Sequence, residues 1–280
     1  MKKYSLVIDV GRCENCNNCF LSCKDEHCGN DWPGYSISQP LHGQRWMNIR
    51  RKERGQFPLV DVAYLPQPCM HCDEAPCIKT STNGGVYKRE DGVVIIDPTK
   101  ARGQKNIVDA CPYGAIWWNE KAQVPQKCTL CAHLLDQGWK APRCVQACPT
   151  GALSIQYLES GELEALAASE KLVQLAVEGS NTMPRVYYKN LYLFTTCMIV
   201  GSVATNKLGV SECVVGATIK LLREGMSVAE QVSDEFGDYK FDGLPLESGG
   251  YEIEVIYGDQ AVTKEIGILQ QSFSVETLWI

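Results

Sequence analysis

The stretch Cys13-Glu-Asn-Cys16-Asn-Asn-Cys19-Phe-Leu-Ser-Cys23 decides how the first part of this chain folds. Its spacing, C-x2-C-x2-C-x3-C, is typical of loops in which three thiolates bind one [4Fe–4S] cluster and the fourth binds another. The short gaps let one tight loop point three sulfurs at one cluster. The fourth sulfur faces away, so a second run elsewhere in the chain is required, and the fold must bring the two runs together.

The composition limits the class of protein to which this chain can belong. The chain has 280 residues and is 45% hydrophobic, which is enough for two domains with cores of their own. Its 15 cysteines leave disulfides, zinc sites and iron–sulfur sites as alternatives. No secretory signal is visible before Cys13, so we expect a cytoplasmic protein without a disulfide framework, with export alongside a partner left open. The net charge of −6 argues against nucleic-acid binding, and the uncharged stretch between Lys189 and Lys207 is too short and polar for a membrane span.

Further cysteines repeat the pattern, with losses. With the first stretch as run one, they form runs two to four in chain order: Cys69, Cys72 and Cys77 (run two); Cys111 alone (run three); and Cys128, Cys131, Cys144 and Cys148 (run four). By the same spacing rule, the second run lacks its fourth cysteine and the third run lacks its first three. At the missing positions stand Ser81, Ala101, Gln104 and Ile107. The segments Cys111-Pro-Tyr-Gly-Ala-Ile and Cys148-Pro-Thr-Gly-Ala-Leu repeat one unit, a turn followed by a strand.

These losses predict three clusters. If runs two and three are partners, all four missing ligands belong to one site, which has been lost as a whole. The remaining cysteines then form three complete sets: Cys13, Cys16, Cys19 and Cys148 (group A); Cys23, Cys128, Cys131 and Cys144 (group B); and Cys69, Cys72, Cys77 and Cys111 (group C). Cys28, Cys197 and Cys213 are left over. We interpret His71, inside the second loop, as a hydrogen-bonding neighbour and not as a ligand.

Zinc is the main alternative metal. Zinc ribbons and fingers close one tetrahedral site with paired C-x2-C knuckles. Runs of four cysteines, and Cys-Pro followed by Gly-Ala, do not follow that pattern, so the spacing favours iron–sulfur clusters. Such clusters move single electrons. We expect no catalytic residues on this chain.

The order of the cysteine groups, the Arg89-Glu-Asp-Gly92 loop and Cys111-Pro-Tyr-Gly-Ala resemble the iron–sulfur (beta) subunits of molybdopterin oxidoreductases of the dimethyl sulfoxide reductase family. The resemblance covers residues 1 to about 195 and includes Pro184-Arg-Val-Tyr-Tyr188. It implies a double ferredoxin-like domain in which runs one and four pair and runs two and three pair. It also implies a large catalytic partner subunit, which alone carries the molybdopterin cofactor.

Several further segments resemble one particular subgroup of this family. Trp32-Pro-Gly-Tyr35, Arg45-Trp-Met-Asn-Ile49, Val186-Tyr-Tyr-Lys-Asn-Leu-Tyr192 and the extra C-terminal region are similar to the small subunits of transhydroxylases of the pyrogallol–phloroglucinol type. This implies a partner that moves a hydroxyl group between phenols. Two other hypotheses stay open: a conduit subunit of a respiratory molybdenum reductase, and a free polyferredoxin carrier. The lost site and the C-terminal region favour the first hypothesis.

The expected fold class is α+β. Residues 1–195 form the cluster domain, with a strand over Tyr4–Val10, a hairpin over Val86–Asp97 that turns at Asp91-Gly92, and a connecting helix near residues 162–177. Residues 196–280 show short alternating strands between Gly and Asp turns. They predict a seven-stranded all-β sandwich, which resembles transthyretin and carboxypeptidase-regulatory modules. We expect this domain to dock or stabilise, with binding of an outside ligand as the alternative.

Overall fold

The computed structural model describes residues 1–280 and divides into two compact units. The first unit comprises Met1–Arg50 and Tyr64–Leu191, and the second comprises Arg51–Ala63 and Tyr192–Ile280. The second unit thus begins a few residues before the sequence-based boundary at residue 195. It also takes in the end of a hairpin that lies far earlier in the chain, which the sequence did not predict.

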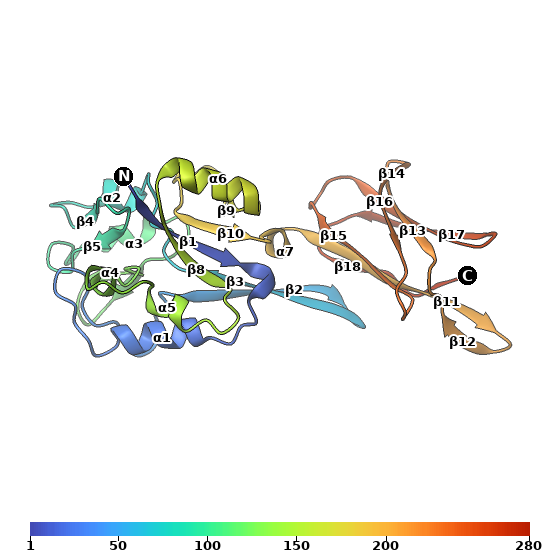
Figure 1. Cartoon of the computed structure of the whole chain (residues 1–280), viewed down its shortest axis with the longest axis horizontal. Coiled ribbons are helices and arrows are strands. Elements are labelled where there is room, and N and C mark those ends of the chain that lie inside the picture. Colours follow the sequence, from blue (N-terminus) through green and yellow to red (C-terminus); the bar gives the residue numbers. More distant parts are fainter. The chain divides into compact units, whose positions relative to one another are not determined.

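The first unit is built around a four-stranded sheet in the order β8-β1-β10-β9 (Figure 1). Its members are β1 (Lys3–Asp9), β8 (Leu153–Leu158), β9 (Val173–Gln174) and β10 (Val186–Lys189). Strand β1 confirms the predicted strand, and its apolar run is buried on the sheet. Strands β1 and β8 are antiparallel, with Ile8 opposite Leu153. This register brings the start of the first cysteine loop beside the Cys-Pro turn that precedes β8.

Short helices carry or follow the cysteine loops. They are η1 (Val10–Arg12), α1 (Asn18–His27), α2 (Pro76–Thr80), α3 (Asn106–Asp109), α4 (Ala132–Asp136) and α5 (Arg143–Gln146). Helix α1 contacts α5, and α2 contacts α3. These two helix pairs join the first run to the fourth and the second run to the third. None of the helices is long and apolar enough to cross a membrane.

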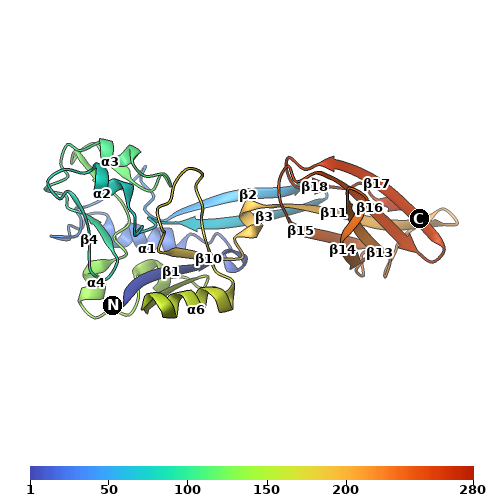
Figure 2. The same ribbon diagram turned by 90° about the horizontal axis from the view of Figure 1, so that it is seen from above.

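The connecting helix is shorter than predicted. Helix α6 spans Ser160–Glu170 and lies alongside β1 and β10 (Figure 1, Figure 2). It starts at a capping box formed by Glu159 and Glu162. It ends because Lys171 adopts a left-handed conformation and the following N–H bonds back to Ala167 at 2.8 Å. The apolar spacing beyond this point belongs to β9, so the prediction of a helix to residue 177 is wrong.

Three hairpins complete the first part of the chain: β2 (Asn48–Gln56) with β3 (Leu59–Gln67), β4 (Val86–Lys88) with β5 (Val94–Ile96), and β6 (Trp117–Asn119) with β7 (Val124–Gln126). The β4–β5 turn has three residues, not the predicted two. The Arg89 N–H donates to the Val93 carbonyl at 2.9 Å, and the Gly92 N–H donates to the Arg89 carbonyl at 3.0 Å. Gly92 has a φ of +87°, which glycine adopts without strain.

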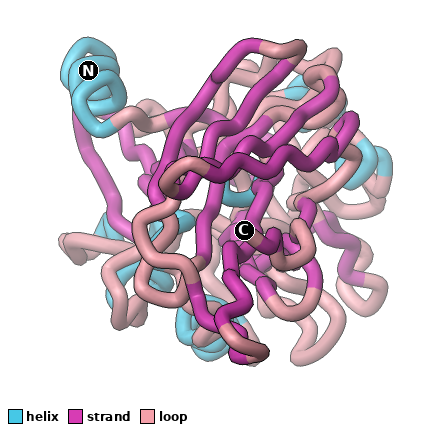
Figure 3. The backbone as a smooth tube through the Cα atoms, turned by 90° about the vertical axis from the view of Figure 1, so that its right-hand side faces the viewer, coloured by secondary structure: helices cyan, strands magenta, loops and turns pink.

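The second unit contains two sheets and the short helix α7 (Tyr192–Thr195). One sheet has the order β12-β11-β15, with β18 and β19 also paired to β11; the other has the order β14-β13-β16-β17. Strands predominate around the C terminus (Figure 3). Their bounds are β11 (Cys197–Lys207), β12 (Val210–Cys213), β13 (Thr218–Arg223), β14 (Met226–Val232), β15 (Asp238–Leu244), β16 (Gly250–Tyr257), β17 (Gln260–Ile268), β18 (Phe273–Ser274) and β19 (Leu278–Trp279).

Both sheets of the second unit contribute to one hydrophobic core. Alternate residues of β11 and β15 meet alternate residues of β13 and β16, as the two-residue period of strands requires. The core includes Ile199, Val203, Ile219, Leu221, Tyr239, Phe241, Ile253 and Val255. The region has nine strands where the sequence predicted seven. The two additional short segments, β18 and β19, gain their strand character only by pairing with β11.

Candidate metal centres

Group B surrounds one cavity in the first unit. Cys128, Cys131 and Cys144 of the fourth run line it together with Cys23, the last cysteine of the first run. The rest of the lining is mainly apolar and includes Met47, Leu130 and Pro142. The structure thus brings together the four cysteines that the run spacing assigned to this group.

Group C surrounds a second cavity. Cys69, Cys72 and Cys77 line it with Cys111, which lies far beyond them in the sequence. The α2–α3 contact and the Cys111-Pro112 turn carry Cys111 to this place. Three of these four thiols are buried, and Cys111 is half-buried.

Group A lies at the end of strand β1. The pKa of Cys19 is raised to about 12, first by burial and then by the neighbouring thiolates of Cys13, Cys16 and Cys148. Cys148 therefore lies near the first loop, in agreement with the β1–β8 register. Cys16 is exposed, so group A reaches closer to the surface than group B does.

The donor chemistry of these groups fits a metal cluster. Burial, and then the other cysteines of the same group, raises the pKa of Cys23 and Cys144 well above the ordinary thiol value. Burial likewise raises the pKa of Cys131 to about 12 and that of Cys77 to about 11. Metal ligation requires the thiolate. Four buried thiolates around one cavity would repel one another, and a bound iron–sulfur cluster would supply the positive iron charge that holds them together.

Backbone geometry supports the same interpretation. Within the C-x2-C loops, Asn15, Asn17, His71 and Leu130 all have positive φ values between +44° and +62°. This conformation is strained for residues with a side chain and is common at functional sites. It turns backbone N–H groups toward sulfur. The His71 N–H lies 3.4 Å from Cys69 Sγ, and the Leu130 N–H lies 3.3 Å from Cys128 Sγ. Such bonds tune cluster potentials.

The three groups follow one another in space. The charge of Cys19 in group A acts on Cys144 in group B. The charge of Cys69 in group C acts on Cys128, also in group B, whose sulfur also accepts a bond from the Cys69 backbone. Group B therefore has neighbours in both group A and group C.

The residues at the lost site lie together, as expected, and bond to the backbone. Gln104 Oε1 accepts from the Thr82 N–H at 2.8 Å, and its Nε2 donates to the Thr82 carbonyl at 3.2 Å. Ser81 Oγ donates to the Ile78 carbonyl and accepts from the Val86 N–H, both at 3.1 Å. These two polar side chains stand at positions where the run spacing calls for cysteine. Their hydrogen bonds hold the surrounding loops together instead.

Apolar packing fills the rest of the lost site. Ala101 and Ile107 are 0% exposed. A Cβ added to Gly85 would lie 3.0 Å from Gln104 Nε2 and 3.2 Å from the Ala101 Cα, closer than nearly all ordinary contacts. The segments that would surround a fourth cluster are therefore packed directly against each other.

His71 is a hydrogen-bonding neighbour, as predicted. Its Nδ1 accepts from the Val94 N–H at 3.0 Å, and burial lowers its pKa well below the usual value. Sequence reasoning missed two other neighbours. His27 lies one turn after Cys23 on α1 with Nε2 3.9 Å from Cys131 Sγ, and Lys127 directly precedes Cys128 and is 2% exposed. Adjacency to a ligand was the signal that could have found both.

The three leftover cysteines join no group. Cys28 Sγ lies 3.6 Å from the Pro40 carbonyl, Cys197 is part of the core of the second unit, and Cys213 is exposed.

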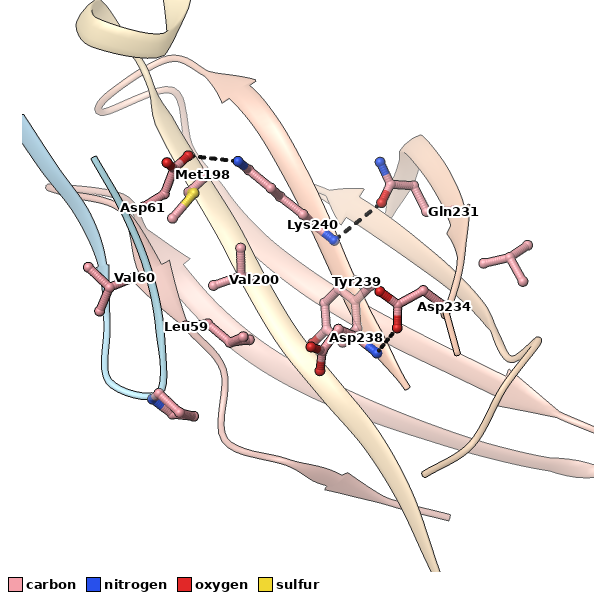
Figure 4. A pocket seen from close by; sticks show the side chains of 12 residues that line it. Leu59, Val60, Asp61, Met198, Val200, Gln231, Asp234, Asp238, Tyr239 and Lys240 are labelled. Atoms are coloured by element: carbon pink, nitrogen blue, oxygen red, sulfur yellow. Dashed lines mark hydrogen bonds and ion pairs between the residues drawn. The ribbon is translucent and has the colours of Figure 1, made fainter. Parts of the chain in front are cut away.

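The second unit has a pocket of about 440 Å³ between the turn of the β2–β3 hairpin and the strands β11, β14 and β15 (Figure 4). Asp61 and Lys240 form an ion pair of 2.8 Å at its edge. Asp234 accepts from the Asp238 N–H at 2.9 Å. The lining contains no cysteine or histidine.

The paired runs and their cavities define a protein of the ferredoxin type with several [4Fe–4S] sites. A family model described as "4Fe-4S dicluster domain" matches residues 60–158. The chain is 45% identical over 259 residues to the pyrogallol hydroxytransferase small subunit of Pelobacter acidigallici, and the match covers 91% of each chain. It is 36% identical to a subunit of the sulfite dehydrogenase of Allochromatium vinosum, over 54% of this chain and 68% of the relative. It is 29% identical to the arsenate respiratory reductase iron-sulfur subunit ArrB of Shewanella sp., over 66% of this chain and 95% of the relative.

The chain therefore belongs to the family of the pyrogallol hydroxytransferase small subunit, within the iron–sulfur subunits of dimethyl sulfoxide reductase-type enzymes. All three relatives bear the names of enzyme subunits.

Proposed function

We propose that this chain is the iron–sulfur small subunit of a molybdenum enzyme that transfers hydroxyl groups between phenols. It holds three [4Fe–4S] clusters, one in each of groups A, B and C. Its large partner subunit carries the molybdopterin cofactor and the substrate site.

One observation carries the proposal. The similarity to the pyrogallol hydroxytransferase small subunit covers 91% of this chain, so it cannot be confined to the cysteine loops and must include much of the second unit. The match to the sulfite dehydrogenase subunit covers only 54% of this chain. The part shared with redox subunits alone is therefore shorter than the part shared with the hydroxytransferase subunit.

The chain's own residues bind the clusters and tune them. The twelve cysteines supply the thiolates, and backbone N–H groups of the loops donate to Cys69, Cys111 and Cys128 at 3.3–3.4 Å. The apolar linings of the group B and group C cavities exclude water. Bound clusters supply one-electron transfer.

The lost site indicates how the electrons are used. A row of clusters that ends at group C is suited to an enzyme whose net reaction consumes no electrons, where the clusters prime or rescue the molybdenum centre. The main alternative is a conduit of a respiratory reductase, which the arsenate reductase relative supports. A conduit needs an exit for a continuous current, and the packing of Ala101 and Ile107 closes the position of a fourth cluster.

For the second unit we propose a transthyretin-like sandwich that docks onto or stabilises the complex. Two sheets with one shared core support this fold. The lack of cysteine and histidine in the lining of its pocket supports a structural role.

Anaerobic purification of the chain with its partner tests the function. We expect molybdenum in the complex, about 12 iron atoms per copy of this chain, and hydroxyl transfer from a tetrahydroxybenzene cosubstrate to pyrogallol. The donor becomes phloroglucinol and pyrogallol becomes a tetrahydroxybenzene, so no external electron acceptor is needed. A complex that is inactive in that assay but sustains many turnovers of electron flow to a dye would support the conduit instead. A chain that purifies alone with all its iron would support the free carrier.

A further inference from the structure

Lys127 is a cation buried without a carboxylate. It directly precedes Cys128, and only 2% of the residue is exposed. Its Nζ donates to the Val94 carbonyl and, at 3.1 Å, to the Cys128 carbonyl. No Asp or Glu oxygen lies within ion-pair distance of this nitrogen. The residues that line the small cavity beside Lys127 also include no acidic side chain.

Other buried cations nearby are paired in the ordinary way. Lys88 and Arg185 both form ion pairs with Asp73, the second at 3.0 Å. A buried ion that lacks a counter-charge is strongly destabilising, because it loses hydration without electrostatic compensation. Backbone carbonyls alone do not provide that compensation. Lys127 therefore requires an anion other than an Asp or Glu carboxylate.

The position of Lys127 identifies this anion. Val94 lines the group C cavity, and Cys128 is a member of group B. Lys127 bonds to the backbone of both residues, so its ammonium group lies between the two groups. Burial raises the pKa of Cys77, Cys111 and Cys128, and the charge of Lys127 opposes that rise in all three. The same charge thus acts on sulfurs of groups B and C.

We propose that Lys127 is the internal counter-ion shared by clusters B and C, and that it raises the reduction potentials of both. The inference rests on the proposed binding of clusters by these groups. A [4Fe–4S] cube with four thiolates is an anion, and one-electron reduction makes it more negative. A fixed positive charge in a medium of low dielectric constant favours the reduced form. Cluster A is not expected to share this interaction, since both hydrogen bonds of Lys127 go to residues that line the group C cavity or belong to group B.

Potentiometric titration of the complete complex, followed by electron paramagnetic resonance, tests the proposal. Lys127→Met removes the charge at similar volume. Lys127→Gln removes the charge but keeps an N–H donor, and Lys127→Arg keeps the charge. Lys105→Met is the matched control, because Lys105 is exposed and paired with Glu120. Cys13→Ser identifies the signal of cluster A.

We expect Lys127→Met and Lys127→Gln to lower the reduction equilibrium constants of clusters B and C by about tenfold or more, which is about 59 mV for a one-electron couple. Lys127→Arg and Lys105→Met should change these equilibrium constants by less than about threefold. The reduction potential of cluster A should stay the same in every variant. Loss of clusters B and C from the two neutral variants, with retention in Lys127→Arg, would also support the counter-ion role.

Three results would overturn the inference: unchanged potentials of B and C in fully loaded Lys127→Gln, an equal shift of cluster A, or the same loss in Lys127→Arg as in Lys127→Gln. The iron content of the wild-type complex is measured in parallel. A wild-type value far from about 12 per chain would contradict the proposed function itself, whereas a correct value with unmoved potentials would contradict only the role of Lys127.

Discussion

Truncation of Ile107 to alanine tests whether the lost fourth site is filled. Ile107 belongs to α3, stands at a position where the run spacing calls for a cysteine, and is 0% exposed. If side chains have replaced the cluster, Ile107 is a core residue, and shortening it leaves a cavity. If the segments only border an open space, shortening it costs little.

The magnitude follows from the burial of the side chain. Ile107→Ala removes three carbon atoms, each worth about 0.8 kcal/mol of lost burial. The cavity left behind adds a further cost, so the total is about 3 kcal/mol, within the range of about 2–5 kcal/mol for such truncations. For a unit of this size, that loss lowers the melting temperature by about 6–12 °C.

The assay is thermal unfolding of the cluster-loaded protein under anaerobic conditions, followed by circular dichroism and by the visible absorbance of the clusters. Val108→Ala is the matched control, because Val108 is the next residue of α3 and is only half-buried. It should cost about 1 kcal/mol or less. Equal shifts for the two variants would refute the claim that the site is packed.

Three further predictions concern the clusters and the second unit. Cys111→Ser should lower the iron content from about 12 to about 8 atoms per chain and abolish one paramagnetic signal; loss of the signal that Cys13→Ser removes would contradict the run pairing. Arg54 is fully buried and paired with two carboxylates, so Arg54→Met should destabilise the second unit by about 3–5 kcal/mol. Arg51→Met, at an exposed ion pair, should cost well under 1 kcal/mol, and similar melting temperatures for the two variants would count against this. Burial raises the pKa of Asp61, but bonds from Lys240 and Arg54 outweigh it and lower the pKa to about 2, below the ordinary 3.8. Its stabilising contribution is therefore complete above about pH 3.8 and is lost as the pH falls toward 2. Asp61→Asn should flatten the acid dependence of unfolding in that window, and parallel curves for the variant and the wild type would disprove this role.

The sequence by itself determined the cysteine groups. Ligand spacing within a loop is a local property, because a few backbone angles decide which sulfurs can reach one cluster. The pattern of missing ligands was consistent with runs two and three as partners, and the family resemblance implied which runs pair. The structure places Cys23 with the fourth run and Cys111 with the second, as that logic required. Strand β1 could also be predicted from the sequence, because its apolar run is continuous.

Boundaries were less predictable. Helical spacing continues past Glu170, but the left-handed Lys171 and the pairing of β9 with β10 end α6 there. The Asp91-Gly92 dipeptide indicated a turn but not its length, which the bond from Arg89 N–H to Val93 sets. The hydrophobic alternation of the C-terminal region showed strands. It could not show that the two-residue segments β18 and β19 pair with β11, since such short pairings depend on the partner strand.

Only the tertiary structure decided which polar residues lose contact with water. Lys127 has an ordinary place in the sequence, and nothing there shows that its ammonium group is buried between two cysteine groups without a carboxylate. Arg54 likewise follows Arg50-Arg-Lys52 in the sequence, yet its side chain is fully buried and bonded to Asp61 and Asp242. Burial of a charge is set by every segment packed around it, whereas cysteine spacing is set by the chain between the ligands. For this reason the candidate ligands could be predicted from the sequence, whereas the fold determined the electrostatic environment around them.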